Sequence, residues 1–397
     1  MKHQAYDPEW AFYAALRRQA ARWQRQQQLS AAQLAEIEAA YPLSYYRPAW
    51  PLRVGLFLFA LLGLSMAGVF SFVITHESPL FAGLLHCAAC FGVLELLIKE
   101  RRFYQAGADN ALLYAGLSGA VGLIVYVSYT YLWPVHLGQD FTPAYALAPL
   151  LLILALLLAA TVRYADALTT AAAVAVALLM AALVIVLIPF GLALLPFLLM
   201  GTAGLLLRLH HALTRRLAGT QLTDYYASCL LVLKVLALVV LYLAGNYLVV
   251  REGNAALHNL SVSAQVPFAS VFYALTAGIP LLYIVLGLRR ADRPMLLLGM
   301  LALAFSVFTL RHYRSLLPPE IAAVVAGAIL TVMAGALLRW LRPARFGLTS
   351  EADDEPRHFN LENLIQAQTA HAPTAPASSG FEFGGGQSGG GGATGQF

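Results

Sequence analysis

Lys234 is the first residue whose type and position could support a chemical function, because it is a lysine inside an apolar segment. Lys234 falls within the apolar run 226–250, where an ionisable side chain must pair, lose its charge or snorkel to the membrane surface. Glu95, near the end of the run 80–98, is the partner that we expect at the same depth. The two side chains could form a coupling-ion or proton site. A structural ion pair, or a lysine that snorkels to the inner interface, is the alternative.

A second group of polar residues falls at the outer ends of two predicted spans. Tyr242 and Asn246 are four residues apart and therefore share one helix face. The arginines of this group lie on the side of the membrane where positive charge is rare, so we expect an acidic partner such as Glu252 or Glu320. The group predicts a site for an anionic ligand, a lipid headgroup or a protein partner; the alternative is a salt-bridge network that closes the bundle. Its members are Tyr242, Asn246, Arg251, Glu252, Arg311, His312, Arg314 and Glu320.

Three further residues are a weak candidate for metal binding: His86, Cys87 and Cys90. His86 and Cys90 share a helix face, but a zinc site usually needs three or four converging ligands. Because cysteine also packs as a small hydrophobic residue, we expect these side chains to pack rather than to bind an ion. The sequence therefore predicts no metal and no cofactor.

Patterns that would indicate catalysis are missing from the sequence. It contains no HExxH motif and no Walker loop, and its carboxylates form no paired cluster. Intramembrane enzymes usually carry several polar motifs within their helices, whereas Lys234 is nearly alone. We therefore do not expect this chain to be an enzyme.

The elements that would position these residues are membrane helices. Of the 397 residues, 60% are hydrophobic and 11% are charged, whereas soluble domains are about 25% charged. Apolar runs long enough to cross a bilayer recur along the chain, and they are apolar on all sides. We predict an all-α, polytopic transmembrane helical bundle of about ten spans; eight or nine also fit, because the turns between 144 and 209 are very short. The predicted spans are 54–75, 80–98, 110–132, 144–162, 167–188, 190–209, 226–250, 268–288, 295–311 and 320–338.

The distribution of basic residues predicts the orientation. With the N-terminus in the cytoplasm, most basic residues at span ends fall inside, and only Arg251, Arg311 and Arg314 fall outside. Ten spans then place the C-terminus in the cytoplasm as well. Basic residues confined to span ends favour contact with membrane lipids and argue against nucleic acid as a partner.

The composition divides the chain into three parts. Residues 1–50 predict cytoplasmic amphipathic helices, the second of which starts at Ser30 with the capping-box spacing to Gln33. These helices either lie on the inner leaflet, or pack on the transmembrane domain or on each other. We place the transmembrane domain at 51–345. Residues 346–397 are acidic and then glycine-rich, and we expect a disordered cytoplasmic tail that could recruit a protein partner.

Three stretches carry a resemblance to bacterial membrane proteins. GNYLVVREGN at 245–254 and TLRHYRSLLPPE at 309–320 resemble an uncharacterised group of polytopic inner-membrane proteins. The ending FGGGQSGGGGATGQF at 383–397 is similar to the glycine-rich tails of membrane proteins that carry a TPM domain. The resemblance implies a multi-pass protein of the bacterial inner (cytoplasmic) membrane, and it brings no substrate with it.

Two functions remain open at this point. The first is transport or sensing of a small solute through the helical bundle, with Lys234 and the outer polar group on the path. The second is a non-transporting membrane scaffold that recruits partners through its cytoplasmic tails. The intramembrane lysine and the outer arginines favour the first, which is our leading hypothesis. The shortage of polar residues along most spans favours the second.

Overall fold

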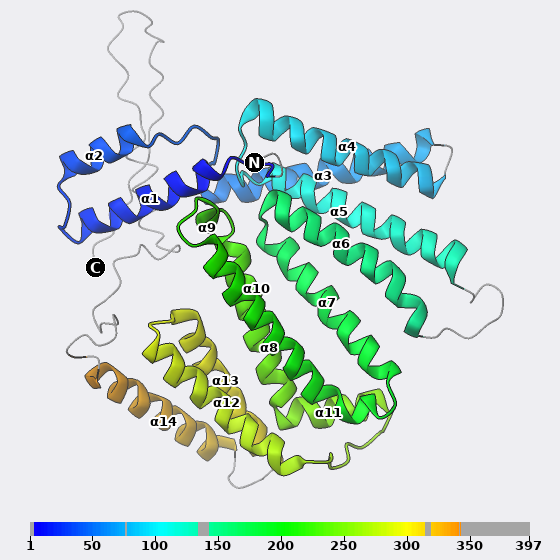
Figure 1. Cartoon of the computed structure of the whole chain (residues 1–397), viewed down its shortest axis with the longest axis vertical. Coiled ribbons are helices and arrows are strands. Elements are labelled where there is room, and N and C mark those ends of the chain that lie inside the picture. The colour runs from blue at the N-terminus through cyan, green and yellow to red at the C-terminus, as the bar shows by residue number, and fades with distance from the viewer. Residues whose placement is uncertain (1–3, 76–77, 134–142, 314–318, 341, 343–397) are drawn as a thin grey trace, which may run out of the picture. The chain divides into compact units, whose positions relative to one another are not determined.

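The computed structural model describes residues 4–75, 78–133, 143–313, 319–340 and 342 (Figure 1). Within these ranges the regular elements are helices, and extended backbone pairs only in one isolated bridge between Tyr46 and Phe103. In chain order the helices are α1 (Pro8–Arg25), α2 (Ala31–Ala40), α3 (Trp50–Ile74), α4 (Pro79–Arg101), α5 (Ala108–Val127) with its π-helical extension η1 (Ser128–Leu132), η3 (Pro143–Ala146), α6 (Leu147–Tyr164), α7 (Ala167–Leu187), α8 (Gly191–Leu217), α9 (Leu222–Tyr225), α10 (Ala227–Gly245), α11 (Tyr247–Leu257), α12 (Ala269–Arg289), α13 (Arg293–Tyr313) and α14 (Pro319–Trp340).

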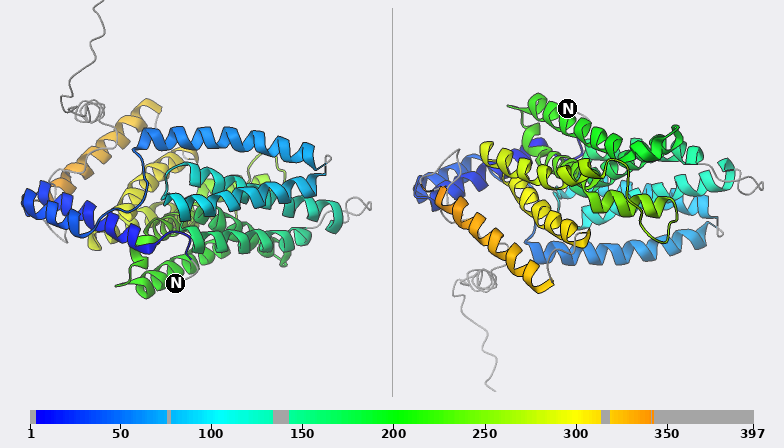
Figure 2. Two further views of the ribbon diagram at one scale, coloured as in Figure 1. Left: turned by 90° about the horizontal axis from the view of Figure 1, so that it is seen from above. Right: turned by 90° about the horizontal axis from the view of Figure 1, so that it is seen from below.

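The membrane helices pack mainly against neighbours in the sequence. α3, α4 and α5 form one group, α8 lies beside α10, and α12 lies beside α13 (Figures 1 and 2). One hydrophobic core is centred on α4 to α7 and also takes in residues of α1, α9 and α10. A second core, which includes Leu238, Tyr283 and Ala302, joins α10, α12 and α13. α10 contacts α7, α8, α12 and α13, so it connects the two cores. The compact unit that holds these helices ends at Ala352, and the predicted tail 346–397 lies outside the described residues.

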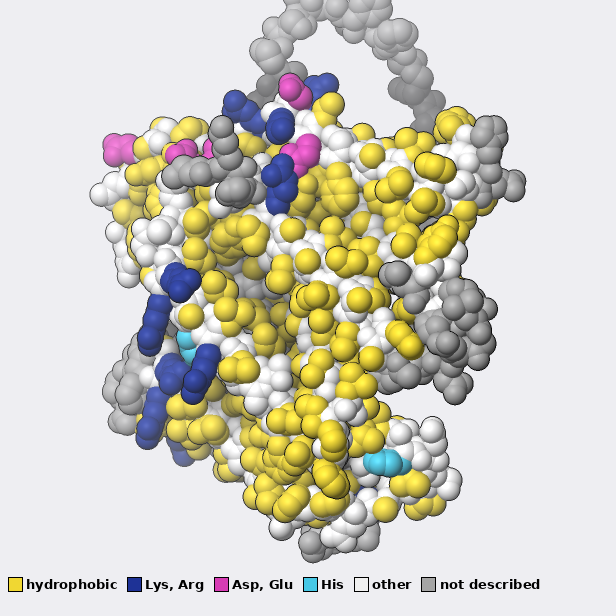
Figure 3. All heavy atoms as spheres, turned by 45° about the vertical axis from the view of Figure 1, so that its right-hand side comes forward, with side chains coloured by type: hydrophobic (Ala, Val, Ile, Leu, Met, Phe, Trp, Pro, Cys, Tyr) yellow, Lys and Arg dark blue, Asp and Glu magenta, His cyan; other side chains and the backbone are white. Residues whose placement is uncertain are grey.

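The helices confirm the predicted polytopic bundle. Among the described residues, nine helices are long and apolar enough to cross a membrane: α3 to α8, α10, α12 and α13. The tenth predicted span coincides with α14, which has 22 residues. Large hydrophobic side chains such as Phe59 and Leu301 are exposed on these helices. Figure 3 shows hydrophobic side chains over most of the face drawn, with Lys and Arg gathered in a few places. Such a surface is suited to lipid rather than to water.

The region with the shortest turns forms three separate helices. Only Ala165 and Asp166 separate α6 from α7. Ala165 takes the left-handed conformation with a φ of 49°, and the Asp166 side chain caps α7 by accepting from the Thr169 amide at 2.8 Å. Phe190, between α7 and α8, is also left-handed, with a φ of 61°. These turns reverse the chain within two or three residues. The region 144–209 therefore holds three spans, as predicted, and the short turns do not merge any of them.

The seventh span is shorter than the sequence predicts. We predict 226–250, but α10 ends at Gly245 and Asn246 leaves the helical conformation. The Asn246 side chain accepts from the amides of Leu248 and Val249 and so caps a separate helix, α11. Because apolar residues continue past the break, hydropathy alone could not locate it.

The contacts of the N-terminal helices favour the expectation that these helices pack on the protein rather than lie on the lipid surface. α1 packs against the short helix α9, and Tyr6, just before α1, is buried in the core of the first membrane helices. The predicted capping box is present, since Ser30 accepts from the Gln33 amide and Gln33 accepts from the Ser30 amide. α2 buries no residue, and the ion pair of Arg17 with Glu38 at 3.2 Å ties it to α1.

Gly107 is required where the loop before α5 meets α3. Its φ is +103°, and a Cβ at this position would lie 2.2 Å from the Arg53 carbonyl oxygen.

We expect Gly107→Ala to lower the free energy of unfolding by about 2 kcal/mol, measured as a lower Tm of the purified protein in detergent. Gly122→Ala in α5 is the control, because a Cβ at Gly122 meets nothing within 4 Å. Equal Tm values for the two variants would contradict this expectation.

Candidate functional site

Lys234 pairs with Asp292 and not with Glu95, the partner expected from its depth. The Nζ atom of Lys234 contacts Oδ2 of Asp292, and the two side chains are only 17% and 16% exposed. Lys234 lies on α10, whereas Asp292 lies in the turn between α12 and α13. The expectation of a Lys234–Glu95 pair is therefore wrong. Depth places a residue along the membrane normal but does not say which helices are neighbours.

Asp292 also shapes the turn in which it lies. Its other carboxylate oxygen accepts from the Met295 amide at 3.3 Å, and its carbonyl accepts from the Leu296 amide, so it caps α13. α8 packs beside α10, and the Nδ1 atom of its His210 is buried without a hydrogen bond. The ion pair thus joins α10 to the α12–α13 turn, with α8 alongside.

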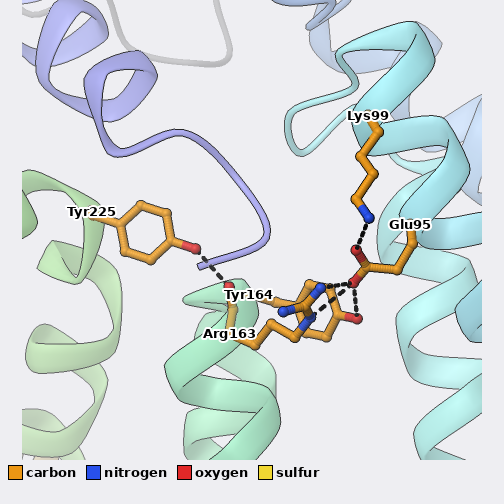
Figure 4. A network of polar contacts seen from close by, with 5 residues as sticks. All are labelled: Glu95, Lys99, Arg163, Tyr164 and Tyr225. Carbon is orange, nitrogen blue, oxygen red and sulfur yellow. Dashed lines mark hydrogen bonds and ion pairs between the residues drawn. The ribbon is translucent and has the colours of Figure 1, made fainter. Parts of the chain in front are cut away.

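Glu95 belongs to a separate network at the ends of α4 and α6 (Figure 4). One carboxylate oxygen accepts from Arg163 at 2.7 Å and from the Tyr164 hydroxyl at 2.8 Å, and the other lies 4.0 Å from Lys99. The Tyr225 hydroxyl donates to the backbone carbonyl of Arg163 at 2.7 Å. The carboxylate is therefore paired within the protein, and the network holds α4 against the end of α6.

The residues before α1 insert into the same region, and we call Ala5 and Tyr6 the N-terminal strap. The Ala5 amide donates to the Arg163 carbonyl at 2.8 Å, and the Tyr6 hydroxyl donates to Asp109 at 2.8 Å. Asp109 is fully buried and also accepts from the Gly107 amide at 3.0 Å. Burial, and then the charge of Asp109, raise the pKa of Tyr6 well above its ordinary value.

Tyr242 and Asn246 meet as their spacing predicts, but they do so inside the protein. The Asn246 side chain donates to the Tyr242 hydroxyl at 2.9 Å and to the Thr309 hydroxyl at 3.1 Å. Tyr242 in turn donates to the Ala302 carbonyl at 2.8 Å, and its oxygen lies 2.9 Å from that of Ser306. All of these side chains are buried, and the network joins the end of α10 to α13.

Arg251 is held by aromatic rings and a carbonyl rather than by an acidic residue. Its guanidinium carbon lies 4.5 Å from the ring centroid of Tyr313 and 6.0 Å from that of Tyr247, which are cation–π distances. It also donates to the Ser263 carbonyl at 2.7 Å. Glu252 instead accepts from the Tyr313 hydroxyl. The expected ion pair of Arg251 with Glu252 is therefore replaced by contacts that each residue makes separately to Tyr313.

Two further members of the outer group, Arg311 and His312, lie at the end of α13. Arg311 is half-buried in the last turn, and His312 is exposed, with its ring stacked on Phe308 at 6.2 Å. Arg314 lies outside the described residues, as does the side chain of Glu320 in the first turn of α14. The outer group is thus divided between the Tyr242–Asn246 network and the contacts around Tyr313.

His86, Cys87 and Cys90 pack along α5, as the packing interpretation predicts. A Cβ added to Gly119 would lie 3.0 Å from the Cys87 sulfur, and one added to Gly116 would lie 3.2 Å from Cβ of Cys90. The Cys90 sulfur lies 3.5 Å from Nε2 of His86. Among the described residues, no three His, Cys, Asp or Glu side chains come together as a metal site would require.

Several residues at these sites were not expected from the sequence. Asp292 did carry a signal, because an aspartate just before Arg293 and Pro294 is a pattern typical of a helix N-terminus. Thr276, which accepts from the Tyr247 amide at 2.9 Å, carried none. Threonine and serine are common in membrane helices, and their hydroxyls often bond to their own helix instead.

Comparisons with protein-family models, curated proteins and solved structures found no match. The fold and its internal polar contacts define the class of protein, which is a multi-pass helical membrane protein. Its function must be inferred from its own geometry.

Asp292→Asn tests the ion pair while preserving the cap of α13, because asparagine is also a good N-cap residue. The variant leaves Lys234 charged and largely buried, so we expect the free energy of unfolding to fall by about 3 kcal/mol. The double variant Lys234→Met, Asp292→Asn should recover most of this loss. Glu38→Gln, which breaks the more exposed pair with Arg17, should cost less than about 1 kcal/mol. Denaturation in mixed micelles measures all of these values, and equal losses in the single and double variants would show that the pair is not the cause.

Acid should loosen the contact between α11 and α13. Hydrogen bonds from Tyr313 and then Ser263 lower the pKa of Glu252 below its ordinary value of 4.5. Because the pKa of Glu252 is lowered, its ionised carboxylate stabilises the folded state at pH values above 4.5. This contribution is lost as the pH falls from 4.5 through the lowered pKa. We therefore expect the Tm of the wild type to fall more steeply with acid in this range than the Tm of Tyr313→Phe. Parallel profiles would contradict the assignment.

Proposed function

We propose that this protein senses or moves a small solute across the bacterial inner membrane, with α10, α12 and α13 as the responding elements. The observation that carries the proposal is the ion pair of Lys234 with Asp292, which is largely buried between a membrane helix and a turn. Ionisable groups at membrane depth are costly, and they commonly mark ion or proton pathways. The bacterial membrane rests on the resemblance of residues 245–254 and 309–320.

The break in the seventh span supports the same proposal. α10 stops at Gly245 and α11 starts at Tyr247, and discontinuous helices form the binding sites of many secondary transporters. Three sets of polar contacts hold α10 to the α12–α13 hairpin: the ion pair at the turn, the hydrogen bond from the Tyr283 hydroxyl to the Leu238 carbonyl, and the Asn246 network at α13. A solute that replaces the ion pair or the Asn246 network would weaken the attachment of α10 to the hairpin, and this loosening is the conformational change that we propose.

The surroundings of Lys234 favour a proton or a small cation as the coupling species. Four hollows among the described residues are lined mainly by apolar side chains, and Lys234 lines none of them. A bulky organic solute would need a wide path to the pair. A proton or a small cation needs only small movements of the surrounding side chains.

The proposal predicts a flux that depends on Lys234. We would reconstitute the protein in liposomes and record charge movement on a solid-supported membrane after concentration jumps of H⁺, Na⁺, K⁺, amino acids and short carboxylates. Lys234→Met should reduce the charge movement at least about tenfold, the factor that 1.4 kcal/mol of lost interaction produces. Lys99→Met is the control, because that lysine is 70% exposed and lies on α4, and it should leave the signal unchanged.

A non-transporting scaffold is the second candidate. α2 favours it, because this helix buries no residue and leaves its surface open to a partner. A scaffold should give no charge movement with any of these solutes, and deletion of residues 351–397 should remove partners that co-purify with it. A transporter should keep its charge movement in that deletion. Equal charge movement in the wild type and in a stably folded Lys234→Met would contradict the role that we assign to Lys234.

A further inference from the structure

A hollow of about 220 Å³ lies where α8, α10, α11 and the start of α12 meet. Leu195 of α8 and Leu243 of α10 line two of its walls, and Val249 and Gly253 of α11 line a third. Neither member of the ion pair lines it. The hollow is therefore a separate feature, which lies against the short helix that follows the break at Asn246.

The chemistry of the lining favours an apolar occupant. Among the lining residues, Asn254 alone has a polar side chain. An apolar cavity offers water too few hydrogen-bond partners, and one of roughly 150 Å³ is large enough to bind benzene. The hollow can therefore accept several carbon atoms of an apolar molecule, and it offers little to hold a charged solute.

The position of the hollow makes it accessible to lipid. Leu243 and Leu257, which line it, are themselves 36% and 51% exposed. The segments that flank the helices around the hollow carry apolar side chains that are even more exposed. Phe190 is 85% exposed, Val262 78% and Phe268 63%. Side chains of this kind are expected to contact the bilayer rather than water. The apolar molecules available to the hollow are therefore the lipids around the protein.

The backbone beside the hollow is strained. Phe190 and Phe268 directly precede α8 and α12, and both take the left-handed conformation, with φ values of 61° and 59°. This conformation is unusual for a bulky residue, and strained residues cluster at ligand-binding sites. Phe268 also contacts Phe197 of α8, with ring centroids 6.0 Å apart, so the two helix starts are packed together.

We propose that this hollow binds the end of one acyl chain of a membrane phospholipid between α8, α10 and α11. The chain occupies the space that Gly253 leaves open, where a Cβ would meet no atom within 4 Å. It holds α11 against α8 directly after the break in the seventh span, so lipid binding stabilises this short helix. The inference does not depend on the solute or on the Lys234–Asp292 pair.

Gly253→Leu is the variant that tests the inference, because Gly253 lines the hollow and a Cβ at this position meets no atom within 4 Å. Gly204→Leu is the matched control: Gly204 is also a helical glycine with nothing within 4 Å, but it lines a different hollow between α7 and α8. Native mass spectrometry counts the phospholipids that remain bound after purification in a mild detergent. The delipidated proteins are then titrated with dioleoyl or dihexanoyl phosphatidylglycerol, which share a headgroup and differ in chain length, while the Tm is recorded.

The wild type and Gly204→Leu should each retain one phospholipid more than Gly253→Leu. Their Tm should rise by about 3–6 °C with the dioleoyl lipid and not with the dihexanoyl lipid. Gly253→Leu should show no rise, and in the delipidated state its Tm should be at least that of the wild type, because leucine fills the space. Val249→Phe fills the same hollow from another position on α11 and should behave in the same way.

Two results would overturn the inference. One is an equal number of bound lipids, with equal rises in Tm, in Gly253→Leu and Gly204→Leu. The other is an equal rise with the two lipids, because the headgroup alone would then account for the binding.

Discussion

A polar group that leaves water for the interior of a membrane protein must find its partner within the chain, because the hydrocarbon around it offers none. In this protein that constraint adds specific contacts between helices that are distant in sequence. The most extensive packing is between neighbours such as α4 with α5 and α12 with α13. By contrast, Glu95 connects α4 to α6, and Lys234 connects α10 to the α12–α13 turn. The polar contacts are few, and each fixes a pairing that hydrophobic burial alone would leave less specific.

The Asn246 side chain both caps a helix and links two helices. Its oxygen accepts from two amides and so begins α11, while its nitrogen donates to Tyr242 and to Thr309. The end of the seventh span and its attachment to α13 therefore depend on the same amide group. A movement that displaces this amide from α13 also removes the cap of α11, which couples the membrane helix to the short helix that follows it.

The sequence predicts the features that depend on local spacing and on average composition. The ten spans follow from apolar runs, the capping box from the spacing of Ser30 and Gln33, and the contact of Tyr242 with Asn246 from the helical repeat. The partner of Lys234 could not be predicted in this way, because Asp292 is distant in sequence and only the packing of α10 against the α12–α13 hairpin brings the two together. The aromatic contacts of Arg251 were missed for the same reason, since Tyr313 belongs to another helix.

The N-terminal strap sets an order on the assembly of the molecule. Ala5 and Tyr6 are synthesised before their partners Arg163 and Asp109, which follow much later in the sequence. Tyr225, which shares the Arg163 carbonyl with Ala5, is made later still. The docking site of the strap is therefore complete only after α6 has entered the membrane and α9 has been translated. The strap therefore reaches its final place later than its position before α1 suggests, and a docked strap marks a molecule in which α5, α6 and α9 are assembled.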